Sequence, residues 1–543
     1  MIKHQKYILI LGIISINVVL ITTFLVYPEK WYAFLPFLIF ASLINASSVL
    51  LILSHKMGHA PMGVNQRSEA KNYIYIIPCY NESFTELQMM LTSIHAQQTF
   101  QGDTRSLLII CDGSVQGQGN DMATDGILKQ ILNIDEENEE PFINSYKTWD
   151  GRPNSVTMYE GEFKGLNYFL IIKATNYGKR DSLVLARQLC YEFNTNTGLT
   201  THANEHLFDH IEPYLTCVYG GETIDYIIGI DADTLFDYNC SYELIRTMEN
   251  GGPTVVGCVG LVDITPTYHP WSPFVLYQYA EYRIAQSLRR LTQSLVTGKV
   301  SCLSGCNQIL RICKETCGAE ILAKFNYLPP ENDNLFNHIR SFASEDRNHV
   351  CLMLSMYPEV KTVQNMLAIA YTTVPNSFNV FFSQRRRWSL GASLNDLLLV
   401  TLPGINIFER ISAVVNCINY VTSPFITVAS AVMIKAFIQG PTYLMLMLSI
   451  LIFIPQGYNL LLPFFQGFFF RQSLYFYLAY TVYIVVAIPL NLCIFANSVC
   501  NMDVLKWGKT RAVAKPAADL TGLTRLTVRK ELAISFAEKE TDC

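Results

Sequence analysis

The chain has 543 residues, of which 50% are hydrophobic and only 16% are charged, whereas about a quarter of the residues in a soluble protein are charged. The apolar residues gather in blocks near both ends, and the middle has the composition of an ordinary globular domain. These features indicate a membrane protein that carries a soluble domain. The net charge of −5 argues against a nucleic-acid-binding protein, which usually has a surplus of basic residues.

Two uncharged blocks near the N-terminus, 7–27 and 31–53, are each long enough to cross ~30 Å of hydrocarbon. Pro28, Glu29 and Lys30 leave room only for a tight turn between them. We therefore predict a hairpin of two transmembrane helices over residues 1–56. Lysines and arginines flank this hairpin on both sides, so the positive-inside rule places the following domain in the cytoplasm.

The next segment, 57–375, is predicted to be one cytosolic domain. Short β-rich runs alternate there with polar or helical stretches, which predicts an α/β fold with a mainly parallel sheet and helices on both faces. The predicted strands are 73–78, 107–111, 168–172, 226–230 and 255–261. In such sheets the ligand binds beyond the carboxyl ends of the strands.

Residues that can bind or react follow four of these strands directly: Tyr80, Glu82, Asp112, Lys173, Asp231 and Asp233. Asp231 and Asp233 are separated by one residue, so both can offer hard oxygen ligands to Mg²⁺ or Mn²⁺, with substrate phosphates completing the shell. A lone pair of this kind is a weak signal, because two surface aspartates can equally cap the next helix.

Two later motifs strengthen the chemical interpretation. SEDR contains Glu345 and Asp346, and QRRRW contains Gln384, Arg387 and Trp388. An aspartate beside a metal-bound diphosphate can take a proton from an attacking hydroxyl. An arginine can hold the leaving diphosphate, and a tryptophan face suits a sugar ring. Together these groups indicate displacement of a nucleoside diphosphate from a sugar, although the arginine run can alternatively anchor an interfacial helix, predicted over 376–403, to the membrane.

The C-terminal third contains three more apolar blocks, 407–437, 443–470 and 474–499, within a membrane part predicted over 404–500. Three full crossings would place the tail, 501–543, outside, yet its many lysines and arginines favour the cytoplasm. One block is therefore expected to be interfacial or re-entrant. The last block is our candidate, because Pro489 and Asn491 interrupt it.

An amphipathic pattern over 277–295 predicts a helix that lies on the membrane surface, with packing against the globular domain as the alternative.

Eight motifs occur in a characteristic order: CYNES, CDGS, NYGKRDS, DAD, SCLSGC, SEDR, QRRRW and, after Asp503, WGK. In this order they resemble the processive family 2 glycosyltransferases, and the combination is most similar to the chitin synthases. The resemblance covers about residues 72–511. GKRDS together with DVLKWGK favours chitin over cellulose as the product.

The resemblance implies a GT-A-like domain that transfers N-acetylglucosamine from UDP-GlcNAc, with Mg²⁺ or Mn²⁺, to a growing β-1,4 chain with inversion and export. It implies roles on the donor side as follows: Tyr80 and Glu82 contact the uridine, Asp112 reads the uracil, Lys173 and Asp231 lie at the UDP, and Asp233 holds the metal. On the acceptor side it implies that Asp346 is the base, with Glu345 beside it as a second catalytic residue, and that Gln384 and Trp388 line the acceptor site. It also implies that Arg387 faces the diphosphate and that Trp507 lies in a loop reaching back to the nucleotide.

A polymer made in the cytoplasm needs a path through the bilayer. Polar and aromatic residues in the first C-terminal block would be costly against lipid, so we expect them either to line this path or to bond neighbouring helices. These residues are Asn416, Asn419, Tyr420, Thr422 and Ser423.

Three alternatives stay open at this point: a hyaluronan synthase or other β-glycan synthase, a transporter with a nucleotide-binding domain, and an inactive scaffold. The expected partners are UDP-GlcNAc, the growing chitin chain and the lipid bilayer, with no nucleic acid, and a homodimer is left open. The expected location is a membrane, the plasma membrane first, crossed several times.

Overall fold

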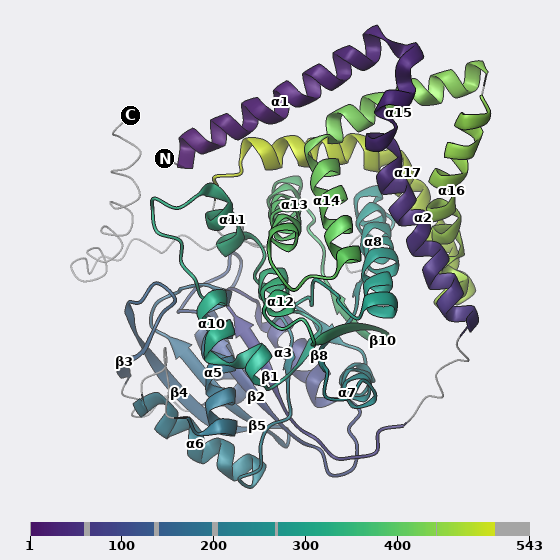
Figure 1. Cartoon of the computed structure of the whole chain (residues 1–543). Helices are drawn as coiled ribbons and strands as arrows, with labels where there is room; N and C mark the ends of the chain where they lie inside the picture. The colour runs from purple at the N-terminus through teal and green to yellow at the C-terminus, as the bar shows by residue number, and fades with distance from the viewer. Residues whose placement is uncertain are drawn as a thin grey trace.

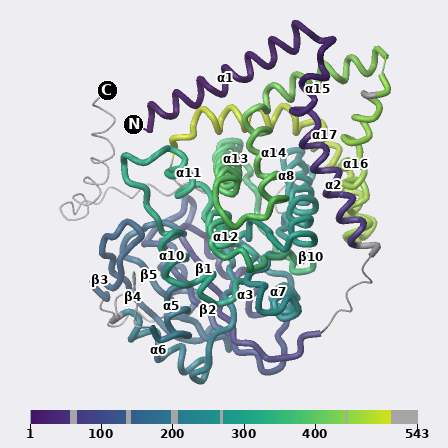
Figure 2. The backbone as a smooth tube through the Cα atoms, in the orientation of Figure 1, coloured from purple at the N-terminus to yellow at the C-terminus, as the bar shows by residue number. Residues whose placement is uncertain are grey.

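The computed structural model describes residues 2–58, 66–134, 141–197, 205–265, 270–440 and 442–504. Trp507 and the WGK motif lie outside these ranges. Figure 1 shows a sheet domain at one end of the molecule and a group of long helices at the other, and Figure 2 follows the same path of the backbone.

One mixed sheet of ten strands forms the base of the molecule, in the order β3-β4-β5-β2-β1-β6-β9-β8-β10-β7. The strands are β1 (Asn72–Cys79), β2 (Thr104–Cys111), β3 (Phe142–Lys147), β4 (Pro153–Phe163), β5 (Leu166–Lys173), β6 (Tyr226–Gly229), β7 (Leu235–Phe236), β8 (Val255–Ile264), β9 (Gln308–Arg311) and β10 (Lys361–Thr372). The core β5-β2-β1-β6 is parallel, and β8 pairs in parallel with β10. The α/β prediction is therefore confirmed, and the five predicted strands appear as β1, β2, β5, β6 and β8.

Helices cover both faces of the sheet because the core strands are apolar on both faces. The helices of this domain are α3 (Phe84–His95), α4 (Thr124–Leu132), α5 (Lys179–Thr195), α6 (Glu205–Tyr219), α7 (Cys240–Asn250), α9 (Lys314–Cys317), α10 (Ala319–Phe325), α11 (Leu335–Ala343) and α12 (Glu345–Met356). Tyr73, Tyr75 and Ile77 of β1 pack with α3, α4 and α7. Ile74 and Ile76 pack with α5 and α6 on the other face.

The other end of the molecule is helical. Its helices are α1 (Ile2–Val26), α2 (Leu35–Gly58), α8 (Pro273–Ala285), α13 (Phe378–Thr401), α14 (Ile407–Val421), α15 (Ser423–Gln439), α16 (Tyr443–Phe465) and α17 (Phe470–Cys500), with a short 3₁₀ turn at Pro28–Phe34 between α1 and α2. Among the described residues, four helices are long and apolar enough to cross a membrane: Ile2–Val26, Pro28–His55, Met445–Phe465 and Phe470–Cys500.

A bend interrupts the first block of the C-terminal membrane part, and the expectation that the last block is interfacial or re-entrant stays a prediction. α17 runs without interruption over Phe470–Cys500 despite Pro489, whereas α14 and α15 meet at an angle of 80° and form either a broken span or a re-entrant loop. The Asn17 side chain of α1 fills this break. It donates to the Val421 carbonyl (2.8 Å) and accepts from the Phe425 N–H (3.0 Å). Backbone groups that the bend releases are thereby bonded inside the helix group.

The predicted amphipathic helix corresponds to α8, which is followed by two π-helical turns at Gln286–Arg290 and Gln293–Thr297. It does not lie alone on a membrane surface. Leu276, Tyr279 and Ala280 pack against residues of α2, α16, α17 and β8, and Arg283 bonds Asp263 of β8. Helix α8 thus connects the sheet with the membrane helices. This is closer to the alternative prediction, packing against the globular domain, than to a helix that lies on the membrane surface.

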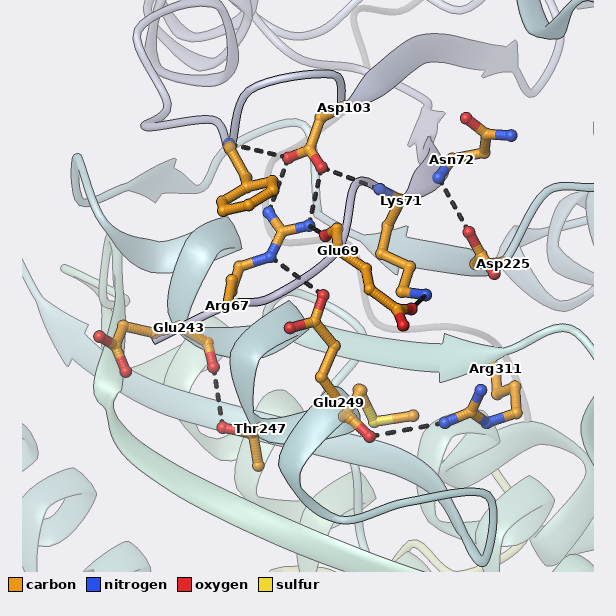
Figure 3. Close-up of polar contacts among 12 residues, drawn as sticks. Arg67, Glu69, Lys71, Asn72, Asp103, Asp225, Glu243, Thr247, Glu249 and Arg311 are labelled. Carbon is orange, nitrogen blue, oxygen red and sulfur yellow. Dashed lines mark hydrogen bonds and ion pairs between the residues drawn. The ribbon is translucent and has the colours of Figure 1, made fainter. Parts of the chain in front are cut away.

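Arg67 fastens the segment that arrives from α2 to the base of the sheet domain (Figure 3). Its side chain is fully buried and forms two bonds to Asp103, of 2.6 and 2.7 Å, and one of 3.2 Å to Glu249. The guanidinium also lies 5.1 Å from the centre of the Phe100 ring. The arginine is therefore paired on both sides, as a buried charge requires.

We expect Arg67→Met to destabilise the protein by ~3–5 kcal/mol, because Asp103 would be left as a buried, unpaired carboxylate. Lys71→Met is the matched control, since the Glu69 partner of Lys71 is largely exposed and such pairs contribute less than ~1 kcal/mol. Thermal unfolding of the purified proteins measures both. Equal melting temperatures for the two variants would contradict the anchoring role.

Candidate active site

The expected strand-end residues gather at one edge of the parallel core. Tyr80 and Glu82 follow β1, Asp112 follows β2, and Asp231 and Asp233 follow β6. β2 and β6 both pair with β1, which brings the three strand ends side by side.

Glu82 and Asp233 are carboxyl groups with raised pKa values. Glu82 accepts the N–H groups of Tyr80 (2.7 Å) and Asn81 (3.1 Å). Burial, and next the charge of Asp233, raise the pKa of Glu82 to about 7. Burial, followed by the charge of Asp231, raises the pKa of Asp233 to about 6. Each of these carboxyl groups would be easier to ionise beside a bound cation, which opposes both burial and the repulsion between neighbouring carboxylates.

The residues present fit a divalent cation only if the substrate supplies part of its shell. Asp231 and Asp233 provide carboxylate oxygens, the donors that Mg²⁺ and Mn²⁺ prefer. No cluster of three or more His, Cys, Asp or Glu side chains suited to a metal occurs in the described part of the chain. Two protein carboxylates plus substrate phosphates is the usual arrangement for Mg²⁺.

Asp112 and Lys173 form a buried ion cluster with Asp181 at the ends of β2 and β5. Lys173 is fully buried, and its Nζ lies 2.5 Å from Asp112 Oδ1 and 2.9 Å from Asp181 Oδ2. Asp112 also accepts the N–H groups of Tyr177 (3.1 Å) and Gly178 (2.7 Å). The cluster thus fixes the loop that leads into α5. The structure gives Lys173 this neighbourhood, whereas the resemblance implied a place at the UDP.

Lys179, which the sequence interpretation did not single out, is the lysine that reaches Asp231, one of the two aspartates expected at the metal. It is the first residue of α5, and its Nζ lies 2.6 Å from Asp231 Oδ1 and 4.0 Å from Glu345 Oε1. Gly178 precedes it with a φ of 88°, a conformation that glycine adopts without strain. The GKR triplet at the end of a strand-end loop was the signal that could have identified it.

Glu345 and Asp346 open helix α12 and differ in charge state. The Gly305 N–H donates to Asp346 Oδ2 (2.8 Å), and Asp346 Oδ1 has no hydrogen-bond partner among the described residues. Burial raises the pKa of Asp346 to about 6, with Glu345 and Asp231 adding to the shift and Lys179 opposing it. Burial also acts on Glu345, but Lys179 and the more distant Arg387 hold its pKa below the usual value. Near neutral pH the pair offers one fixed anion and one group poised to exchange a proton.

QRRRW lies on α13, beside the carboxyl pair. Trp388 is 41% exposed, and its ring lies 5.6 Å from Tyr282 and 4.4 Å from the guanidinium of Arg385. Arg385 is buried, bonds Glu281, and donates to the Gln384 side chain. Arg385 therefore holds the side chains of Trp388 and Gln384 in place.

Helices α13 and α12 touch where Gly391 meets Ser344. A Cβ at Gly391 would lie 2.4 Å from Ser344 Cβ, which real structures do not tolerate. Ser344 directly precedes Glu345 and Asp346, so this contact sets the distance between the carboxyl pair and Trp388.

We expect Gly391→Ala to reduce turnover by about tenfold or more, because small displacements of reacting groups are costly. The KM for the donor should change little. Ser344→Gly in the same chain removes the clashing atom and should restore much of the rate. Gly457→Ala in α16 is the control, since nothing lies near its Cβ position. Failure of the double variant to recover would argue against a packing cause.

The α/β domain, its strand-end acidic edge and the carboxyl pair beside an exposed tryptophan, joined to apolar helices, define a membrane-associated glycosyltransferase. The sequence profile of the chitin synthase family matches residues 47–522. The chain therefore belongs to the chitin synthase family.

Two relatives illustrate the similarity. Chitin synthase 8 of Verticillium dahliae is 35% identical over 460 residues, covering 79% of this chain and 74% of the relative. Chitin synthase 8 of Gibberella zeae is 32% identical over 532 residues, covering 96% of this chain and 79% of the relative. Among solved structures, a mannosyltransferase from Pyrobaculum calidifontis in complex with GDP-Man and Mn²⁺ is 12% identical with a TM-score of 0.40, covering 81% of this chain and 99% of that chain. That likeness is too distant to bear on substrate.

Proposed function

We propose that the protein transfers N-acetylglucosamine from UDP-GlcNAc to the 4-hydroxyl of a growing β-1,4 chain, with inversion, and passes the polymer across the membrane. Family membership supports the substrate. The observation that carries the mechanism is the arrangement around Lys179, which pairs with Asp231 at the strand ends and lies beside the carboxyl pair of α12. The same lysine therefore lies beside the aspartate that would help to bind the leaving group and beside the carboxyl pair that would accept the proton.

On the donor side, Asp231 and Asp233 would hold Mg²⁺ or Mn²⁺ together with the diphosphate. Such an ion stabilises charge that develops on the leaving phosphate. We assign to Lys179, ahead of Lys173, the role of a protein cation at the diphosphate, since Lys173 is enclosed by Asp112 and Asp181. Tyr80, Glu82 and Asp112 stay candidates for the uridine, and Arg387 for the diphosphate.

On the acceptor side, Asp346 accepts the proton of the attacking hydroxyl at Oδ1. The hydroxyl oxygen forms the new bond to the anomeric carbon, the bond from that carbon to UDP breaks, and UDP leaves with the electron pair. A single displacement of this kind inverts the configuration. Gly305 holds Oδ2, so Oδ1 is the oxygen that no donor in the described part of the chain engages. Trp388 and Gln384 would place the acceptor sugar.

Contacts between segments distant in sequence support a common side for the chain ends and the catalytic domain. Lys6 near the start of α1 lies 2.6 Å from Asp503 after α17. Gln5 accepts the N–H of Leu335 in α11 (2.7 Å).

Chain ends on one side require an even number of crossings. Gln466 at the end of α16 bonds Arg283 and Ser287 beside the sheet domain, and the C-terminal halves of α2 and α16 pack together. We therefore propose that the bent pair α14–α15 crosses the membrane and that α17 does not cross it completely, so that both chain ends lie on the side of the catalytic domain. This side is the cytosol by the positive-inside rule.

The path of the polymer is also a proposal. Tyr420 packs on Phe495 with ring centres 5.4 Å apart, and the Thr422 hydroxyl donates within its own helix to Ile418 (2.8 Å). These contacts favour helix packing for part of the expected polar set. A cavity of about 380 Å³ between α13 and α17, lined by Asn379, Phe382, Ser383, Arg386, Cys493 and Asn497, is the alternative opening beside QRRRW.

Purified protein given UDP-GlcNAc and a divalent metal should release UDP and make polymer that chitinase digests. If polymer formed only when UDP-glucuronic acid was also present, the hyaluronan alternative would replace this proposal. Single reporter cysteines at Lys3 and Asp503, in a chain otherwise freed of accessible cysteines, test the sidedness. Labelling of either position by an impermeant reagent on intact cells would contradict the cytosolic assignment. The homodimer stays a prediction.

A further inference from the structure

A cavity of about 390 Å³ lies behind the catalytic residues, and its walls carry three cations. They are Arg180 of α5, Lys324 of α10 and Arg340 of α11. The remaining polar wall residues include Tyr327, Ser341 and Asn348, and no acidic side chain is among the lining residues that the structure describes. The cavity is thus basic in a protein whose net charge is negative.

Arg180 shows that the hydrogen-bond donors of these cations are not all satisfied by acceptors in the described part of the protein. Its side chain is largely buried, and it donates to the Phe325 carbonyl (2.6 Å) and the Arg340 carbonyl (3.3 Å). Its Nε has no acceptor within the described ranges. A buried guanidinium N–H without an acceptor is costly and calls for a ligand or an ordered water. The carboxylates whose charges act on Arg180 are Glu345 and Asp346, which also contact Lys179 and the Gly305 N–H, respectively.

The other two cations approach from separate helices. Lys324 is exposed at the cavity rim, and the Arg340 guanidinium bonds the Asn337 side chain. Asp333, whose charge acts on Arg340, already accepts from Asn337 (2.9 Å) and from the Tyr327 hydroxyl (3.0 Å). Arginines and a lysine that converge from three helices, with phenol and amide groups between them, match the chemistry of a phosphate group.

We propose that this cavity is a binding site for a phosphate-bearing ligand, separate from the UDP-GlcNAc site. Two residues that line the cavity are close in sequence to residues of the proposed active site. Arg180 directly follows Lys179, and Asn348 lies two residues after Asp346. An occupied site would fix the first turns of α5 and α12. α11 also contacts the start of α1 through Leu335 and Gln5, so the phosphate can come from a soluble molecule or from a lipid headgroup.

The test measures phosphate binding with the donor site kept full. Purified protein saturated with UDP and metal is titrated with radiolabelled inorganic phosphate at constant ionic strength. A parallel arm compares the melting temperature in nanodiscs of phosphatidylcholine with and without phosphatidic acid. The wild-type protein should bind saturably in the first arm or be stabilised in the second, and which arm responds identifies the source.

Lys324→Gln together with Arg340→Gln should weaken the response by at least about tenfold, because two charge-assisted contacts are lost. Lys324→Gln alone, at an exposed position, keeps the test valid if the double variant folds poorly. Lys314→Gln is the matched control, since that lysine is 72% exposed and outside the cavity. Absence of a response in both arms, or equal responses in the variants and the wild type, would overturn the site. Polymer synthesis is not needed for this measurement, so it fails or succeeds independently of the proposed reaction.

Discussion

Replacing Asp346 by asparagine is expected to slow sugar transfer by at least ~10², while UDP binding stays nearly intact. Asparagine keeps the size of the side chain and can still accept the Gly305 N–H through its carbonyl oxygen, but it cannot accept the substrate proton. The fold should not suffer. Burial raises the pKa of Asp346, so ionisation of the native carboxyl above pH ~6 costs folding stability, and the neutral amide removes that cost.

The pH profile gives this prediction a second measurement. Since the pKa of Asp346 is raised to about 6, the wild-type turnover at saturating substrate should fall as the pH drops through this value, because the protonated carboxyl cannot act as a base. At saturating metal, which keeps Asp233 ionised, the acidic limb of the residual activity of Asp346→Asn should be weaker than that of the wild type.

Asp233→Asn is the matched comparison, because it also removes one buried carboxylate from the site. It should weaken metal-dependent UDP binding, measured by calorimetry. If both variants lost UDP affinity to the same degree, the separation of base from metal ligand would be wrong.

Two lysines six residues apart are expected to give opposite results when each is changed to methionine. Lys179→Met should lower turnover by ~10² or more and weaken UDP binding, because a preorganised cation beside the leaving group is lost. Its melting temperature should change little. Lys179 also holds down the pKa of Asp346, so the acidic limb of any residual activity should move to higher pH.

Lys173→Met should instead destabilise the fold by ~3–5 kcal/mol, because Asp112 and Asp181 would lose their shared buried partner. Activity at low temperature should then follow the folded fraction. Melting curves, UDP calorimetry and turnover on the same preparations separate the two lysines. A stable Lys173→Met protein with poor UDP affinity would return the donor role to Lys173.

The parallel core was predictable from sequence because its strands are short apolar runs followed by polar residues. Strands β3, β4 and β10 escaped prediction because they are partly exposed and polar at many positions, so their pattern resembles that of loops. β4 pairs with β5 at the edge of the core, β3 pairs with β4, and β10 pairs with β8 and β7. No local signal in their own sequences requires these pairings.

The same division applies to the site. Asp231, Asp233, Asp346 and Trp388 stood in motifs whose chemistry could be inferred from residue type and strand position. The roles of the two lysines could not, because they depend on which carboxylate each amine meets across the fold. The bend at Thr422 was not predicted for a similar reason: it is stabilised by Asn17, far away in sequence, whereas Pro489 is accommodated within α17.

The two hydrogen bonds from Asn17 to the bend between α14 and α15 affect how the protein is made. The ribosome completes Asn17 about 400 residues before Val421 and Phe425, the two residues that it bonds. Until then the Asn17 side chain can bond only the Ile13 carbonyl of its own helix (2.8 Å), and the bend emerges without the partner for its peptide groups. Biogenesis of the membrane part is therefore completed only after translation of the C-terminal helices. Asn17→Leu should leave insertion of the first hairpin unchanged but increase degradation of full-length chains, which a pulse-chase experiment would reveal.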